Sequence, residues 1–109
     1  MSASAEPLEV CPALASAFQL LGKRWTALIL DVLAHRPARF CEITRAIPGL
    51  SDRLLAERLK ELTAAGLVQH SPSENASNTY ELTAAGQRLL PAFNQIRQWA
   101  KSRNSLVTT

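Results

Sequence analysis

The chain has few cysteines and histidines, the residues on which disulfide scaffolds and many metal centres and catalytic sites depend. The 109 residues include two cysteines, Cys11 and Cys41, which are far apart and form no CxxC pair, so a disulfide framework or a zinc knuckle is not expected. The two histidines, His35 and His70, fall in different predicted elements and at no spacing that metal ligation or a nucleophile and base pair uses. We therefore expect free thiols, no metal, no cofactor and no enzymatic activity.

Long apolar runs are also absent. No run approaches the roughly 18 apolar residues of a membrane span, and residues 1–10 lack the basic start and apolar stretch of a secretion signal. We therefore expect a cytoplasmic protein that does not contact membranes. With 47% hydrophobic and 19% charged residues, the composition is that of one globular domain rather than of a disordered segment. We place this domain at residues 11–103, between a flexible arm (1–10) and a flexible tail (104–109).

Basic residues are concentrated in the middle of the chain. The formal net charge is +3, and residues 23–60 carry eight basic against four acidic side chains, which is 8 − 4 = +4. Those basic residues are Lys23, Arg24, Arg36, Arg39, Arg45, Arg53, Arg58 and Lys60. Such a segment suits contact with phosphate, but an ordinary solvated surface produces the same imbalance, so charge alone does not separate the two interpretations.

Apolar spacing predicts two helices near the N-terminus. Pro12 stands where a first helical residue belongs, and apolar residues at i, i+3, i+4 and i+7 follow until Gly22 ends the helix. The same spacing runs from Trp25 to Leu33, ahead of Pro37, and predicts a second helix. We expect this second helix to be the most buried element.

A third and a fourth helix are predicted on either side of a tight turn at residues 47–50. The third is short and begins after Arg39 and Phe40. Ser51 is a suitable N-cap for the fourth helix, and Gly66 is a suitable stop. The residues expected to face inward are Leu54, Leu55, Leu59 and Leu62. The residues expected to face solvent are Asp52, Arg53, Ala56, Glu57 and Lys60.

A hairpin and a last helix complete the pattern. Residues 67–70 and 79–82 are predicted strands around the polar loop 71–78, and Thr83 can cap the last helix. Pro91 lies inside that helix and should kink or divide it; we predict one bent helix. The helix carries more apolar residues than one small domain can cover, namely Leu89, Leu90, Phe93, Ile96, Trp99 and Ala100.

These elements together predict a winged helix-turn-helix, a fold that is mainly α with a small β-hairpin wing. In such a domain, the N-terminal residues of the fourth helix approach base edges in the major groove of DNA. The residues at that end are Ser51, Asp52, Arg53 and Ala56. Arg53 can make paired hydrogen bonds to guanine. The alternative is that Arg53 is an ordinary solvated helix residue.

The order and spacing of several short segments make the chain similar to the HxlR-type winged helix-turn-helix regulators, relatives of the MarR group. The likeness runs from Cys11 to about Ala100. The matching segments are Cys11-Pro12, Gly22-Lys23-Arg24-Trp25, Leu28-Ile29-Leu30, Arg39-Phe40-Cys41-Glu42-Ile43, Ile47-Pro48-Gly49-Leu50-Ser51, Leu59-Lys60-Glu61-Leu62, Gly66-Leu67-Val68, Tyr80-Glu81-Leu82-Thr83, Gly86 and Leu90-Pro91.

The resemblance implies a homodimeric bacterial transcription factor whose first and last helices form the dimer interface. By matching position, it implies phosphate-backbone contacts for Lys23, Arg24 and Arg39, groove contacts for Ser51 and Arg53, and a thiol sensor at Cys11. When these positions are combined with the outward face of the fourth helix, the full set of expected DNA-binding residues is Lys23, Arg24, Arg39, Ser51, Asp52, Arg53, Ala56, Glu57 and Lys60. The expected dimer residues are Leu14, Phe18, Leu90, Phe93, Ile96 and Trp99.

The chain departs from the family pattern at the fourth helix and the wing. Ala56 stands where the family often has a hydroxyl residue, and Ser77 and Asn78 stand where it has a basic residue near the second wing strand. The wing contains no Lys or Arg. We therefore expect a weaker grip by the wing, with Arg39, Arg53 and the start of the second helix supplying most of the electrostatic affinity.

The two cysteines are expected to differ. Cys11 precedes Pro12 at a helix start, where the helix dipole favours a thiolate, although Glu6 and Glu9 oppose it. It is either a sensor or a small residue filling a helix junction. Cys41 is predicted to be buried packing. The tryptophans, Trp25 and Trp99, stand at helical apolar spacing, which favours core or dimer packing over stacking on an effector.

The sequence thus predicts a sequence-specific regulator of transcription, a repressor that binds a pseudo-palindromic operator in double-stranded DNA. Oxidants or electrophiles acting at Cys11, or an unidentified effector, would relieve repression. The first alternative is a winged-helix module for protein contact, which the neutral wing and the apolar last helix would tolerate. A small thiol-redox enzyme is the second alternative, and the lack of a CxxC pair and of a positioned base disfavours it.

Overall fold

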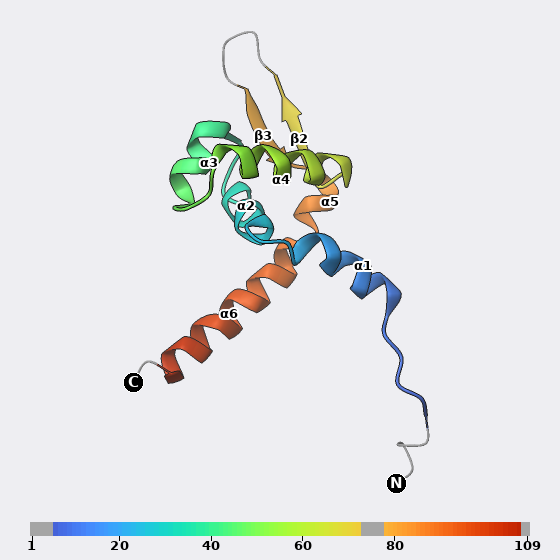
Figure 1. Cartoon of the computed structure of the whole chain (residues 1–109). Coiled ribbons are helices and arrows are strands. Elements are labelled where there is room, and N and C mark those ends of the chain that lie inside the picture. Colours follow the sequence, from blue (N-terminus) through green and yellow to red (C-terminus); the bar gives the residue numbers. More distant parts are fainter. Residues whose placement is uncertain (1–5, 73–77, 108–109) are drawn as a thin grey trace.

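Six helices and three short strands follow one another in residues 6–72 and 78–107, the part of the chain that this computed structural model describes (Figure 1). In chain order they are α1 (Pro12–Leu21), α2 (Thr26–Leu33), β1 (Ala38–Arg39), α3 (Phe40–Ala46), α4 (Asp52–Ala64), β2 (Val68–Ser71), β3 (Thr79–Leu82), α5 (Ala84–Gln87) and α6 (Leu90–Val107). Parts of the expected flexible arm (1–5), wing loop (73–77) and tail (108–109) lie outside the described residues.

The core lies between α2, α3, α4 and the sheet. Its fully buried side chains come from each of these elements: they are Ile29, Leu30, Ile43, Leu55, Leu62 and Val68. Within the eight residues of α2, Thr26, Ile29, Leu30 and Leu33 are all buried, which confirms that α2 is the most buried helix. Three of the four leucines predicted to face inward in α4 are buried, and the other, Leu54, is half-buried.

The two ends of α4 are defined as the sequence predicts. Ser51 Oγ accepts a hydrogen bond from the backbone N–H of Leu54 at 3.1 Å. In the turn before it, Gly49 has φ +91°, and after the helix Gly66 has φ +80°. These values lie in the left-handed region that residues with a Cβ rarely adopt, so glycine lets the chain turn sharply at both ends of α4.

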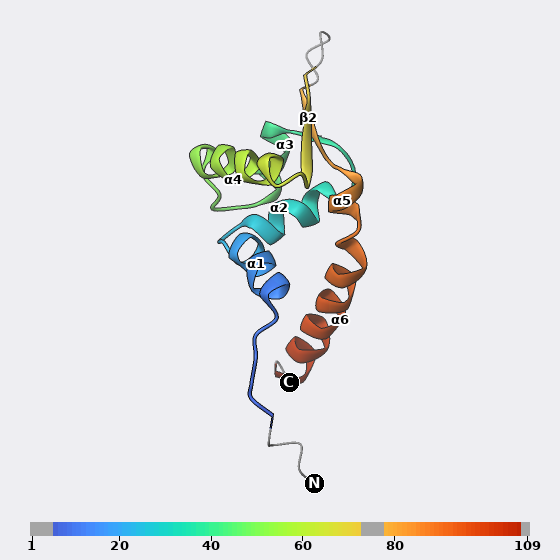
Figure 2. The same cartoon turned by 90° about the vertical axis from the view of Figure 1, so that its right-hand side faces the viewer.

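The three strands form one antiparallel sheet in the order β1-β3-β2. The wing strands β2 and β3 rise beyond the body of the molecule (Figures 1 and 2). β1 was not predicted; it pairs Ala38 with Tyr80 and Arg39 with Thr79. A strand of two residues is too short to show the alternation that identifies strands in a sequence.

Two predictions about helices were wrong. Trp25 does not belong to α2: it precedes the helix with φ +80°, in the left-handed region. The predicted single bent helix after Thr83 is two helices, because Thr83 caps α5 and the chain breaks before Leu90. Pro91 then lies in the first turn of α6, where its missing N–H breaks no helical hydrogen bond.

Helices α1 and α6 project away from the body, and the views in Figures 1 and 2 agree on this. The radius of gyration is 17.2 Å, well above the roughly 13 Å of a compact chain of this length. α6 continues to Val107, past residue 103 where we placed the domain boundary. Among the described residues, none of the helices combines the length and the apolar character needed to cross a bilayer.

Candidate nucleic-acid interface

The outward face of α4 is available for contact. Asp52, Arg53, Ala56, Glu57 and Lys60 are all exposed, as predicted. Because residues three, four and seven apart share one side of a helix, Arg53, Ala56 and Lys60 form one ridge along it. In the first turn, the backbone N–H groups of Asp52 and Arg53 can hold an anion, while that of Leu54 donates to Ser51 Oγ.

On one side of this ridge, α4 and the wing enclose a groove. Its lining residues are Ala56, Leu59, Lys60, Thr63, Ala64, His70 and Tyr80. The ring of His70 stacks on that of Tyr80, with centroids 4.4 Å apart and an interplanar angle of 12°. The sequence alone does not predict this pair, because the two rings stack only when β2 and β3 align.

On the other side, charged side chains attach α4 to the turn between α1 and α2. Lys23 Nζ lies 3.1 Å from Glu61 Oε2. Arg58, whose side chain is only 14% exposed, donates from Nε to the carbonyl oxygen of Arg24 at 3.0 Å and also pairs with Glu61 at 3.5 Å. The predicted DNA contact Lys23 therefore already has an anionic partner. Arg58 therefore links α4 to this turn. In the sequence, the only local sign of this role is that Arg58 stands three residues before Glu61.

The same turn supports the beginning of α4. The Arg24 guanidinium lies over the Trp25 ring, 4.6 Å from its centroid. The Trp25 ring in turn lies beside Gly49, so close that a Cβ on Gly49 would be 3.3 Å from the ring. The turn between α1 and α2 thus contacts the turn before α4 through Trp25, the middle of α4 through Arg24 and the last turn of α4 through Lys23.

Arg39, another predicted phosphate contact, belongs to a charged cluster at the start of α3. Arg36 makes two hydrogen bonds to the Glu42 carboxylate, at 3.1 and 3.3 Å, and the Arg39 backbone N–H makes a third at 2.8 Å. Mainly because of the bond from Arg36, the pKa of Glu42 is lowered to about 2, while Glu42 raises the pKa of Arg36. The Arg39 guanidinium, 4.0 Å from Glu42, remains half-exposed.

These ion pairs determine which basic residues of segment 23–60 are available to contact DNA. Lys23, Arg36, Arg39 and Arg58 all have carboxylate partners. The other four, Arg24, Arg45, Arg53 and Lys60, are exposed and form no ion pair with any described residue. The basic side chains without a carboxylate partner therefore lie on α3 and α4 and, at Arg24, in the turn between α1 and α2.

A second surface, on α1, α2 and α6, is apolar. Leu14, Phe18, Ile96 and Trp99, all predicted dimer residues, are each more than half exposed, and so is Leu28 of α2. The other two predicted dimer residues, Leu90 and Phe93, are half-buried against the core.

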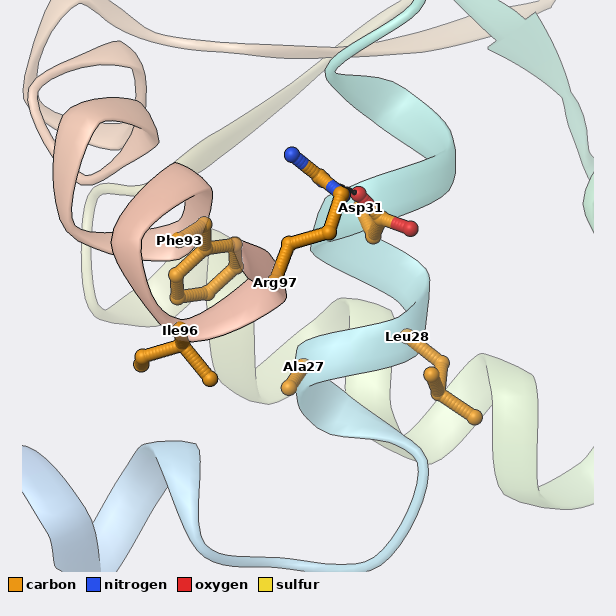
Figure 3. A pocket seen from close by; sticks show the side chains of 6 residues that line it. All are labelled: Ala27, Leu28, Asp31, Phe93, Ile96 and Arg97. Atoms are coloured by element: carbon orange, nitrogen blue, oxygen red, sulfur yellow. Dashed lines mark hydrogen bonds and ion pairs between the residues drawn. The ribbon is translucent and has the colours of Figure 1, made fainter. Parts of the chain in front are cut away.

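Between α2 and α6 lies an open pocket lined by Ala27, Leu28, Asp31, Phe93, Ile96 and Arg97 (Figure 3). Arg97 crosses from α6 to bond the Asp31 carboxylate and also bonds Asn94. This ion pair links α6 to α2.

The cysteines are free and both exposed. Cys11 is the N-cap of α1, and its Sγ accepts a hydrogen bond from the Leu14 N–H at 3.5 Å. The prediction that Cys41 is buried was wrong. Cys41 and the buried Ile43 are two positions apart in α3, which places them on nearly opposite sides of the helix. Within residues 6–72 and 78–107, no group of three His, Cys, Asp or Glu side chains could hold a metal ion.

Comparison with known proteins agrees with this arrangement. Residues 20–106 match the model of the HxlR-like helix-turn-helix family. The HTH-type transcriptional regulator YodB of Bacillus subtilis (strain 168) is 45% identical over 93 residues, which cover 84% of this chain and 83% of YodB. YvaP of the same organism, named as an HTH-type transcriptional regulator, is 43% identical over 94 residues, 84% of this chain and 87% of YvaP.

Solved structures of the same group share the fold. YodB in its reduced form superimposes with a TM-score of 0.76 over 84% of this chain and 92% of that one. Quinone-bound YodB gives 0.75, with 84% and 99% covered, and diamide-treated YodB gives 0.71, with 87% and 96% covered. The match to the family over residues 20–106 and the identity to YodB show that this chain belongs to the HxlR-like helix-turn-helix family and is a transcriptional regulator with a winged helix-turn-helix.

Proposed function

We propose that the protein binds a pseudo-palindromic site in double-stranded DNA as a homodimer and represses transcription by occluding a promoter. The observation that carries the proposal is the exposed ridge of α4, which begins at a capped helix start and carries Arg53 and Lys60 free of ion pairs with described residues. A helix of this kind fits the major groove, which is about 12 Å wide. Arg53 reads a base, while Ser51, the first-turn N–H groups and Arg39 hold phosphates.

Selection of bound sequences from a random duplex pool tests this proposal. The selected duplex should be pseudo-palindromic, and its affinity should fall steeply with salt, since each phosphate contact releases condensed counterions. If the protein retains no duplex from the pool at low salt, DNA binding is contradicted and a winged-helix domain used for protein contact is favoured.

The apolar surface of α1 and α6 supports the homodimer. Leu14 and Phe18 on α1, with Ile96 and Trp99 on α6, are large apolar side chains exposed on helices that project from the body (Figure 2). Burying them against a second copy removes this area from water and brings two α4 helices to one side of a DNA duplex.

We further propose that Cys11 senses electrophiles. Its Sγ lies at the start of α1, beside exposed Leu14 and hence at the proposed dimer surface. The thiol of Cys11 adds to a quinone ring carbon, a C–S bond forms, and the ring takes up the thiol proton to become a hydroquinone thioether. That YodB has been crystallised reduced, quinone-bound and diamide-treated supports the proposal.

Mass spectrometry and duplex binding after quinone treatment test the role of Cys11. The parent should carry the adduct on Cys11 and lose its selected duplex, whereas Cys11→Ser protein should keep it. Cys41→Ser is the matched control, since that thiol is also free and exposed. Faster modification of Cys41, or equal loss of binding by Cys11→Ser, would reject the assignment.

A further inference from the structure

We propose that the groove between α4 and the wing is a binding site for the sugar–phosphate backbone of one DNA strand, with Lys60, His70 and Tyr80 as its contacts. This inference rests on the proposed function and adds to it a specific place where the wing engages DNA. That place is the base of the wing, close to α4.

The shape of the groove suits a backbone strand. Its lining on the α4 side combines the small side chains of Ala56 and Ala64 with the hydroxyl residue Thr63. Small side chains let a bulky chain approach the helix closely. The groove also adjoins the ridge of α4 at Ala56 and Lys60, so a strand lying in it continues directly from the surface proposed to enter the major groove.

The two faces of the wing differ in charge. Gln69 and Glu81 face each other across β2 and β3, and Gln69 Nε2 donates to the Glu81 carboxylate at 2.8 Å. His70 and Tyr80 are the next facing pair, so they project from the opposite face, because side chains alternate along a strand. The acidic residue therefore faces away from the groove, and the groove face offers polar hydrogen-bond donors to an anion.

The groove also supplies a cation and an aromatic wall. Among its lining residues, Lys60 carries a full positive charge, and it forms no ion pair with any described residue. The stacked rings of His70 and Tyr80 form a flat surface with an imidazole N–H and a phenolic O–H. Such a surface can pack against a deoxyribose while its donors reach the adjoining phosphate oxygens. This surface supplies the phosphate contact that a lysine or arginine of the wing would make, since the wing contains neither.

Titration of three variants on two duplexes tests the assignment. The variants are Lys60→Gln, His70→Ala and Gln69→Ala, and the duplexes are the selected site and a random-sequence duplex. Because backbone contacts are independent of DNA sequence, Lys60→Gln should lower the affinity for both duplexes alike. It should also reduce the slope of log affinity against log salt concentration by about 1. His70→Ala should lower the affinity for both duplexes by about two- to tenfold, which corresponds to the net contribution of one hydrogen bond. Gln69→Ala, on the other face of the same strand, should bind like the parent.

Each other outcome overturns a defined part of the idea. Variants at Lys60 and His70 that bind both duplexes as tightly as the parent would reject the groove while leaving DNA binding by α4 intact. A loss confined to the selected duplex would mean base contact rather than backbone contact. Absence of duplex binding by the parent protein would instead remove the proposed function itself. Tyr80→Phe, which keeps the stacked ring, guards against a folding effect: it should lose only the hydroxyl contribution.

Discussion

Arg53 is the side chain on which sequence discrimination is proposed to depend. It is the second residue of α4, exposed and free of ion pairs with described residues. We expect Arg53→Ala to cost about 1 to 3 kcal/mol on the selected duplex and to relax preference at one base pair. Binding titrations on single-base variants of that duplex measure both effects. Arg88→Ala, the same loss of charge at the end of α5, is the control. A uniform loss over all sequences would assign Arg53 to a phosphate.

Glu42 is the residue whose ionisation should govern acid stability at the α2–α3 junction. Its pKa is lowered from 4.5 to about 2 by the hydrogen bond from Arg36. Folding therefore favours the carboxylate, so the stabilisation is complete above the ordinary carboxyl pKa and is lost as the pH falls through that range toward about 2.

Thermal unfolding of the parent and of Glu42→Gln, followed from neutral pH to about 2, checks this expectation. The parent should be more stable at neutral pH, and the difference should close in the acid range as Glu42 takes up a proton. Glu9→Gln, an exposed carboxylate with no ion pair to a described residue, should show no such convergence. A difference that stays constant down to the lowest pH would contradict the mechanism.

At the scale of elements, the turn between α1 and α2 holds α4 in place. Two of its contacts are the Arg58 hydrogen bond to the Arg24 carbonyl and the packing of the Trp25 ring beside Gly49. The contribution of the Trp25–Gly49 contact to stability can be measured by comparing substitutions at two glycines, Gly49 and Gly66, that both have positive φ. A Cβ at Gly49 would lie 3.3 Å from the Trp25 ring, whereas a Cβ at Gly66 would have nothing within 4 Å.

We expect Gly66→Ala to cost about 1 to 2 kcal/mol of unfolding free energy through backbone strain alone. Gly49→Ala should cost more, because the neighbouring Trp25 must shift as well. It should also weaken duplex binding, since Gly49 leads into the capped start of α4. Urea unfolding and DNA titration of both variants measure these effects. Equal destabilisation would show that the Trp25 contact adds nothing.

At the scale of the whole molecule, the projecting helices predict the assembly. If α1 and α6 pair with those of a second copy, the two α4 helices should be about 34 Å apart, one turn of DNA. Ile96→Asp places a charge in the apolar surface and should give monomers by sedimentation, with a large loss of affinity for the full selected site. Gln98→Asp, an exposed position on another side of α6, is the matched control. A parent protein that sediments as a monomer would refute the proposal.

Much of the helical framework could be predicted because its signals are local. Pro12, Ser51 and Thr83 begin helices, Gly66 ends one, and the apolar spacing in α4 identifies its buried side. Each of these signals depends on residues within one or two turns, where backbone sterics and capping hydrogen bonds act. The outward face of α4, and with it the exposure of Arg53 and Lys60, followed from the same local periodicity.

Tertiary structure alone decided which charges are free and which surfaces meet. Lys23 and Glu61 are distant in the sequence, and so are Arg97 and Asp31, yet both pairs form ion pairs. The stacking of His70 on Tyr80 and the strand β1 depend likewise on how whole elements pack. A contact between distant residues forms only when many weaker contacts have already fixed the elements that carry them, so no short stretch of sequence contains its signal.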